Sequence, residues 1–232
     1  MSIRLDHLLV PSRNRTAAAK LLAELLGVPW AESGVGPFSP VYVSNDLTID
    51  FDQAVDSFPV MHYCFHVDDA SFDAVVSTFG VMFAPNQAQA ASEMMRVCKR
   101  SGRIGLANWT PDGFIGQVFK TLGKYLPPPP AGAKSPALWG TRAALDEMFG
   151  SQAGSIKAEP RFFNFRYKSA EHFLEIFKTY YGPVMKAFAA LDAAAQQDLH
   201  NDLYALIVRM NKSGDATMVV PSEYLEVVIV RK

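Results

Sequence analysis

The sequence predicts an α/β protein with a mixed sheet and two parts, residues 1–73 and 74–232. In the first part, short segments of alternating apolar residues surround one helical segment, giving the order strand, helix, strand, strand, strand (βαβββ). In the second part, long segments of helical period alternate with single strand-like segments, which is typical of α/β sheets. With 232 residues, 49% of them apolar, the chain can bury one large core or two small ones.

The first part is expected to form a compact βαβββ module. Residues 3–11 alternate like a strand, and residues 14–27 have helical spacing with Gly27 as a left-handed stop. Residues 40–52 predict two strands joined by an Asn-Asp turn, and residues 60–69 predict a fourth strand. The apolar stripe expected on the helix consists of Leu21, Leu22, Leu25 and Leu26.

The second part starts with a segment that fits two structures. Residues 70–80 have the apolar spacing of a capped helix, but they also fit a buried parallel strand. Beyond this segment the helices are expected at residues 86–102, 112–126, 141–150, 170–182 and 183–211. The strands are expected at residues 103–109, 161–168 and 223–232.

Charge and composition exclude several classes of partner. The formal net charge is -1 and no stretch concentrates Lys and Arg, so neither nucleic acid nor an anionic membrane is an expected partner. The apolar runs are shorter than the ~20 residues that cross a bilayer. The near-neutral charge favours a small neutral or amphipathic molecule as the binding partner. Two unpaired cysteines, Cys64 and Cys98, and the lack of an export signal predict a cytoplasmic protein.

Four motifs follow one another in the second part: "FAPN", "GLANWTP", "FIGQVF" and "ALWG". Through them residues 76–149 resemble the second half of a class I S-adenosylmethionine (SAM)-dependent methyltransferase, so the resemblance implies the C-terminal half of a Rossmann-like methyltransferase fold. It also implies which residues border the methionine moiety or donor methyl group of SAM, namely Ser77, Thr78, Phe79, Met82 and Phe83. The residues implied nearer the methyl acceptor are Trp109, Phe114 and Trp139. A sulfonium cation favours such aromatic faces.

The chain departs from the family in two places. The family usually has a Pro-Gly-Gly turn where this chain has Arg100, Ser101 and Gly102, a change that is compatible if Ser101 does not need a positive φ. The family also holds SAM with a glycine-rich loop and an acidic residue, neither of which the sequence shows at a matching place. The nearest glycines, Gly34 and Gly36, fit an ordinary loop. An impaired or absent donor site follows as an expectation.

The strand segments "LDHLLVP" and "MHYCFHVDD" carry a second resemblance. Residues 2–73 are similar to one βαβββ module of the vicinal oxygen chelate superfamily, which contains glyoxalases and dioxygenases. The resemblance implies His7 and His62 as ligands of a divalent metal, and Asp50 falls at a frequently acidic position. The family builds its site from two modules, so a homodimer would have to supply the second one.

Three functions therefore stay open. The first is a SAM-dependent methyltransferase-like protein that acts on a small molecule with an impaired donor site. The second is a metal-dependent glyoxalase- or dioxygenase-type enzyme completed by dimerisation, with His7 and His62 of both chains meeting across a two-fold axis. The third is a chimera of two half-proteins that binds a small ligand and catalyses nothing. No residue is singled out as a catalytic nucleophile, because no nucleophile or paired-ligand motif occurs.

Overall fold

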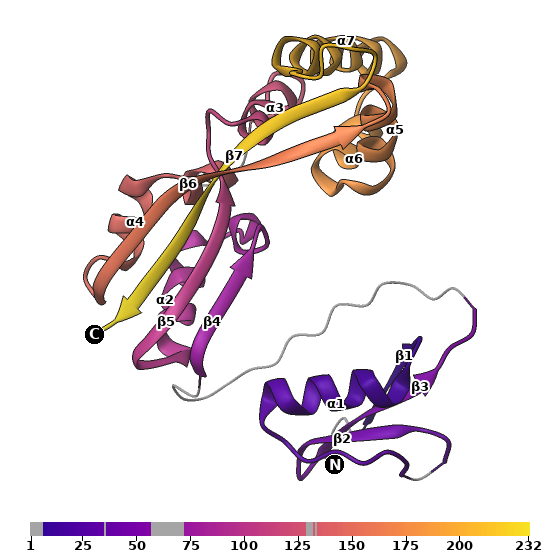
Figure 1. Ribbon diagram of the computed structural model, residues 1–232, viewed down its shortest axis with the longest axis vertical. Coiled ribbons are helices and arrows are strands. Elements are labelled where there is room, and N and C mark those ends of the chain that lie inside the picture. Colours follow the sequence, from indigo (N-terminus) through magenta and orange to yellow (C-terminus); the bar gives the residue numbers. More distant parts are fainter. Residues whose placement is uncertain (1–6, 35, 57–71, 129–131, 133) are drawn as a thin grey trace. The chain divides into compact units, whose positions relative to one another are not determined.

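The structure is a computed structural model that describes residues 7–34, 36–56, 72–128, 132 and 134–232 (Figure 1). The chain separates into two compact units, Met1–Phe65 and His66–Lys232. The predicted division after residue 73 stays a prediction, because residues 57–71 lie outside the described part. No helix among the described residues combines the length and the apolar character that a membrane span requires.

The described residues of the N-terminal unit form a three-stranded sheet and one helix. Its elements are β1 (His7–Ser12), α1 (Arg15–Leu26), β2 (Ser39–Ser44) and β3 (Leu47–Gln53). In the sheet order β1-β3-β2, β1 runs parallel and β2 antiparallel to β3. The predicted order strand, helix, strand, strand is confirmed. The fourth strand expected at 60–69 lies outside the described residues.

Helix α1 packs on this sheet through alanines, which corrects the predicted leucine stripe. The Asn14 side chain caps its first turn by accepting from the amide of Ala17, and Gly27 ends it with φ 67°. Ala19 and Ala23 are buried, whereas Leu21 and Leu25 are 59% and 64% exposed. Small side chains at i and i+4 let the helix approach the sheet closely. Leu22 packs beside them against the core, whereas Leu21 and Leu25 lie on the outer flank.

The C-terminal unit contains a four-stranded sheet. Its strands are β4 (Phe72–Thr78), β5 (Cys98–Trp109), β6 (Ala153–Tyr167) and β7 (Met218–Arg231). The order is β4-β5-β7-β6, with β4 parallel to β5 and β7 antiparallel to both β5 and β6. Of the two structures that residues 70–80 fit, the strand is the one that forms. A mixed sheet within a mixed α/β fold is therefore confirmed.

Helices cover opposite ends of the long β6–β7 pair (Figure 1). At one end, α2 (Gln87–Val97) contacts β4 and β5, and α4 (Arg142–Phe149) contacts β6 and α2. The short 3-10 helices η1 (Val81–Phe83) and η2 (Pro136–Gly140) lie at the same end. The helices at the other end are α3 (Phe114–Leu122), α5 (Ala170–Tyr180), α6 (Gly182–Ala189) and α7 (Ala193–Met210). One apolar core includes buried residues from both ends.

Two predicted helix boundaries in this unit are wrong, and the strands expected at 161–168 and 223–232 begin earlier, at Ala153 and Met218. The helix expected over 86–102 ends at Val97, because Cys98 is already extended and pairs with Phe72 of β4. The helix expected over 183–211 is divided into α6 and α7, since Asp192 caps a new helix by accepting from the amide of Ala195 at 2.9 Å. In both cases the apolar spacing continues across the break, so periodicity alone does not reveal it.

Ser101 adopts the left-handed conformation, with φ 61°, within β5, in the irregular stretch between Cys98 and Arg103 where the register with β4 shifts. The sequence predicts that serine is tolerated here if its φ is negative. Because φ is positive, the backbone at Ser101 is strained. We expect Ser101→Gly to raise the free energy of unfolding of the C-terminal unit by about 1 kcal/mol, because glycine has no Cβ to clash. Urea denaturation checks this, and a loss of stability would contradict it.

Candidate functional site

The candidate site is an aromatic cluster where β4 and β5 end. We define the aromatic cluster as Phe79, Trp109, Phe163, Phe165 and Tyr224. β4 and β5 run parallel, so their carboxyl ends meet at one edge, which is where α/β sheets commonly bind ligands. Antiparallel pairing brings Tyr224 of β7 directly opposite Trp109, and β6 lies next to β7 with its phenylalanines.

Phe79 is the best-defined wall of the cluster. Its ring stacks on Trp109 with centroids 4.0 Å apart and an interplanar angle of 17°, and it meets Tyr224 edge-on at 5.5 Å. The backbone of Phe79 is left-handed, with φ 59°, while its amide donates to the carbonyl of Ala107 at 2.8 Å. A left-handed phenylalanine is strained, and such strain persists only where the surroundings enforce it. The hydrogen bond to Ala107 of β5 fixes the backbone of Phe79, and stacking on Trp109 fixes its ring.

Trp109 lies at the centre of the cluster. It is 7% exposed and contacts Phe165 at 5.7 Å, Tyr224 at 6.1 Å and Phe163 at 6.3 Å between ring centroids. Phe163 itself is 50% exposed, so the cluster reaches the surface on the side of β6. Polar atoms in the cluster come from Tyr224 and Trp109 alone. The cluster offers an apolar contact surface through Phe163, and it contains no carboxylate, histidine or thiol.

The turn beside the cluster uses its polar groups internally. Thr110 Oγ1 accepts from the amide of Gly113 at 3.2 Å, and Ser222 Oγ accepts from the amide of Ile115 at 3.2 Å. These two side chains satisfy amides at the start of α3, which are the usual anion-binding groups of a helix. The beginning of α3 is therefore occupied by the protein's own hydroxyls.

The residues implied to border SAM are only partly brought together. Ser77 Oγ accepts from the amide of Val81 at 3.0 Å, so it shapes the turn after β4. Thr78 is exposed at the end of β4, and Phe79 belongs to the aromatic cluster. Met82 is 1% exposed in the core. Phe83 is 43% exposed and contacts Phe119 edge-on at 5.9 Å, a separate contact from those of the cluster.

Among the residues implied for the acceptor, Trp109 alone joins the cluster. Phe114 is completely buried and packs on Phe165 and Phe173, at 5.8 and 5.5 Å. Trp139 is also completely buried, and its ring contacts Phe149 at 5.9 Å. Both therefore support the core behind the site.

Sequence reasoning missed Asn108, Phe163, Phe165 and Tyr224. Asn108 is completely buried, and neither amide atom has a hydrogen-bond partner among the described residues. A buried amide without partners costs about 1–3 kcal/mol, which makes Asn108 an unusual residue. A polar side chain inside the apolar strand "RIGLANW" was the available signal. For the other three no local signal exists, because strand pairing brings them to Trp109.

The implied metal ligands lie in the N-terminal unit. His7 is exposed on β1 and Asp50 is half-buried on β3, while His62 lies outside the described residues. Leu9 pairs with Asp50, so His7 and Asp50 share one face of the sheet. The buried residues Val10 and Ile49 face the other way. Within the described part of the chain, no three His, Cys, Asp or Glu side chains are grouped to hold a metal ion.

Comparisons with known proteins give one family match and several partial likenesses. The uncharacterized protein Rv1405c of Mycobacterium tuberculosis is 34% identical over 160 residues, or 68% of this chain and 57% of that protein. The uncharacterized protein Rv1403c of the same organism is 37% identical over 121 residues, or 52% of this chain and 44% of that protein. The chain thus spans about half the length of the curated relatives it matches.

Two solved structures show weaker likeness. A putative methyltransferase from an antibiotic biosynthesis pathway of Anabaena variabilis has a TM-score of 0.41 at 15% identity, over 94% of this chain and 99% of that one. Oxidase ChaP-H2 has a TM-score of 0.28 at 30% identity, over 30% of this chain and 54% of that one.

Residues 53–106 match the family model described as "Methyltransferase domain". That match covers less than half of the chain and supports a methyltransferase-like part within it.

Proposed function

We propose that this protein is a SAM-dependent methyltransferase-like protein that binds a small aromatic or cationic molecule at the aromatic cluster, with an impaired donor side. The stack of Phe79 on Trp109 at the ends of β4 and β5 is the observation that carries this proposal. Flat or positively charged groups bind favourably against aromatic faces, by roughly 0.5–2 kcal/mol for each cation–π contact. The match of residues 53–106 to a methyltransferase domain supports the reaction class.

The described residues suit the acceptor side better than the donor side. SAM, when bound, supplies an electrophilic methyl group on a sulfonium, and aromatic rings such as Phe79 and Trp109 suit a neighbouring cation. The cluster would orient the acceptor and exclude water from it. On the donor side, Ser77 Oγ is engaged by the amide of Val81, and Met82 is buried. The sequence offers no glycine-rich loop to let the backbone approach SAM.

Ligand titrations test both halves of this proposal. Phenyltrimethylammonium, an aromatic cation, is expected to bind the wild-type chain and to lose about tenfold in affinity in Phe79→Ala, because one wall of the cluster is removed. Phe83→Ala is the matched control, since its ring contacts Phe119 and not the cluster. Equal affinity of wild type and Phe79→Ala for phenyltrimethylammonium would refute the claim that the small molecule binds at the aromatic cluster. Micromolar binding of SAM, measured by calorimetry, would refute the claim that the SAM-binding side is impaired.

A second candidate function rests on the N-terminal unit. His7 and Asp50 occupy adjacent strands on the sheet face opposite α1, where imidazole nitrogen and carboxylate oxygen suit a divalent cation. With His62 and a second chain, they would complete a glyoxalase- or dioxygenase-type metal site. Stoichiometric uptake of zinc or manganese by a dimer, lost in His7→Ala, supports this function. A monomer that takes up no metal rules it out.

A further inference from the structure

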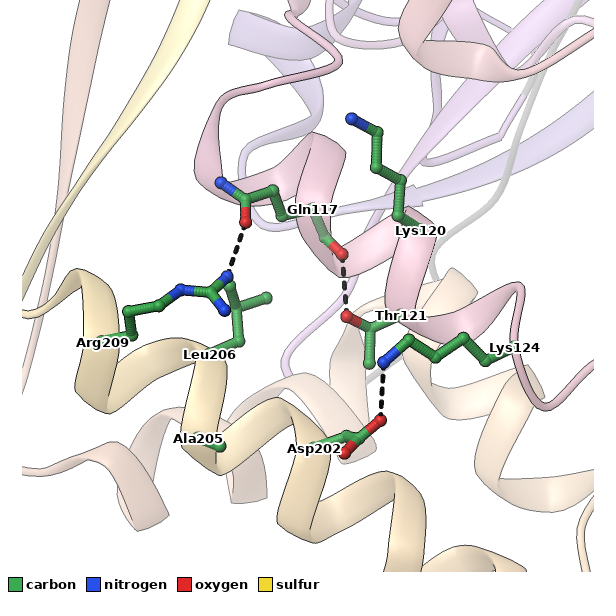
Figure 2. A pocket seen from close by; sticks show the side chains of 8 residues that line it. All are labelled: Gln117, Lys120, Thr121, Lys124, Asp202, Ala205, Leu206 and Arg209. Carbon is green, nitrogen blue, oxygen red and sulfur yellow. Dashed lines mark hydrogen bonds and ion pairs between the residues drawn. The ribbon is translucent and has the colours of Figure 1, made fainter.

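A pocket of about 280 Å³ lies between α3 and α7, outside the aromatic cluster (Figure 2). Thr121 and Leu206 are its most buried lining residues, and both have less than 9% exposure. Three cationic side chains line it: Lys120 from α3, Lys124 from the turn after α3, and Arg209 from α7. Its volume is near the lower end of small-molecule sites, which start at about 300 Å³. The size suits a small ligand.

Arg209 is held in place by a neutral group. Its Nη2 donates to Gln117 Oε1 at 2.7 Å. The amide nitrogen of Gln117 donates to the carbonyl of Asp112 at 3.0 Å, so the oxygen of the amide must face the guanidinium. Figure 2 shows the two side chains meeting across the gap between the helices. The guanidinium is therefore oriented without being neutralised, and it keeps donors for another partner.

The other charges around the pocket leave a positive balance. Lys124 pairs with Asp202 at 2.9 Å, and the pKa of Asp202 lies below its usual range because Lys124 and Tyr125 hydrogen-bond to the carboxylate. The opposite charges of Lys124 and Asp202 therefore neutralise each other. Lys120 extends away from α7 and pairs with Asp112, which does not line the pocket (Figure 2). Both members of that pair are more than half exposed, so the contact is weak and readily exchanged.

We propose that this pocket binds the phosphoryl group of a small phosphorylated molecule, with Arg209 as its principal contact and Lys120 at the rim. A guanidinium matches phosphate oxygens through its planar fork, and charge-assisted bonds of this kind are the stronger ones. Lys120 would leave Asp112 for the doubly charged ligand. Gln117 is a positioning residue, because it acts through Arg209.

Pyrophosphate is the probe, titrated calorimetrically at constant ionic strength into the full chain. We expect Arg209→Gln to weaken binding about tenfold, through loss of the fork. Gln117→Glu is expected to weaken it to a similar degree, because a carboxylate keeps the contact to Arg209 but neutralises it. A purely structural role of Gln117 predicts no such loss. Lys157→Gln is the matched control, since Lys157 is an exposed cation paired with Glu159 on β6.

Each outcome decides the proposal. Binding by wild type and Lys157→Gln within about twofold, with both pocket variants weakened, supports it. Equal weakening in Lys157→Gln would show general attraction of the surface for anions and overturn it. No binding by the wild-type chain at millimolar pyrophosphate would overturn it as well. Arg209 and Lys157 are exposed and Gln117 is half-buried, and circular dichroism checks that every variant keeps the wild-type fold.

Discussion

Trp109→Ala is expected to lower the free energy of unfolding of the C-terminal unit by about 3–5 kcal/mol, the usual cost of removing a buried tryptophan. Trp109 is 7% exposed and contacts four other rings, of which Phe79 is stacked at 4.0 Å. The cavity would open on the face of the sheet among the rings of Phe79, Phe165 and Tyr224, and the backbone bonds between the strands keep the sheet from closing around it. Urea unfolding followed by far-UV circular dichroism measures the loss.

The two units of the chain provide an internal control for this experiment. The transition of the N-terminal unit should keep its midpoint, because Trp109 belongs to the other unit. Trp109→Phe should lose much less stability, since a second ring can still stack on Phe79. A loss below about 1 kcal/mol in Trp109→Ala would show that the cluster is loosely packed, and the aromatic site would lose its structural basis.

Gly116→Ala is expected to destabilise the same unit by about 3 kcal/mol, near the upper end for overpacking. A Cβ at Gly116 would lie 2.2 Å from the carbonyl oxygen of Thr110 and 2.5 Å from that of Pro111. Both atoms are backbone in the turn beside the aromatic cluster, so helix α3 would have to move away from β5. The same denaturation experiment measures the effect.

Gly182→Ala is the matched control for this helix substitution. A Cβ at Gly182, the first residue of α6, would meet nothing within 4 Å. Alanine there should be neutral or should stabilise by up to about 1 kcal/mol, because it lowers the entropy of the unfolded chain. If Gly116→Ala were equally harmless, the close approach of α3 to the turn at Thr110 would be refuted.

Local sequence signals were reliable where a residue acts on its own neighbours. Gly27 ends α1 in the left-handed conformation, as its position after the apolar run predicts. The strand expected at residues 103–109 is the part of β5 that pairs with β7. The signals failed where packing chose between compatible structures: Leu21 and Leu25 are exposed because alanines on a neighbouring stripe fit the sheet better.

The sequence by itself determined the α/β alternation and most of the helices and strands, while the methyltransferase resemblance placed on residues 76–149 overlaps the matched segment, residues 53–106, only in part. Only the tertiary structure decided that Phe79 is left-handed and stacks on Trp109, that Tyr224 lies opposite that tryptophan, and that Gln117 holds Arg209 over a pocket. The physical reason is that sequence patterns report interactions between residues that are close in the chain. Periodicity specifies which face of one element is buried, whereas a site forms from side chains of elements that are distant in the chain and meet through strand pairing and helix packing.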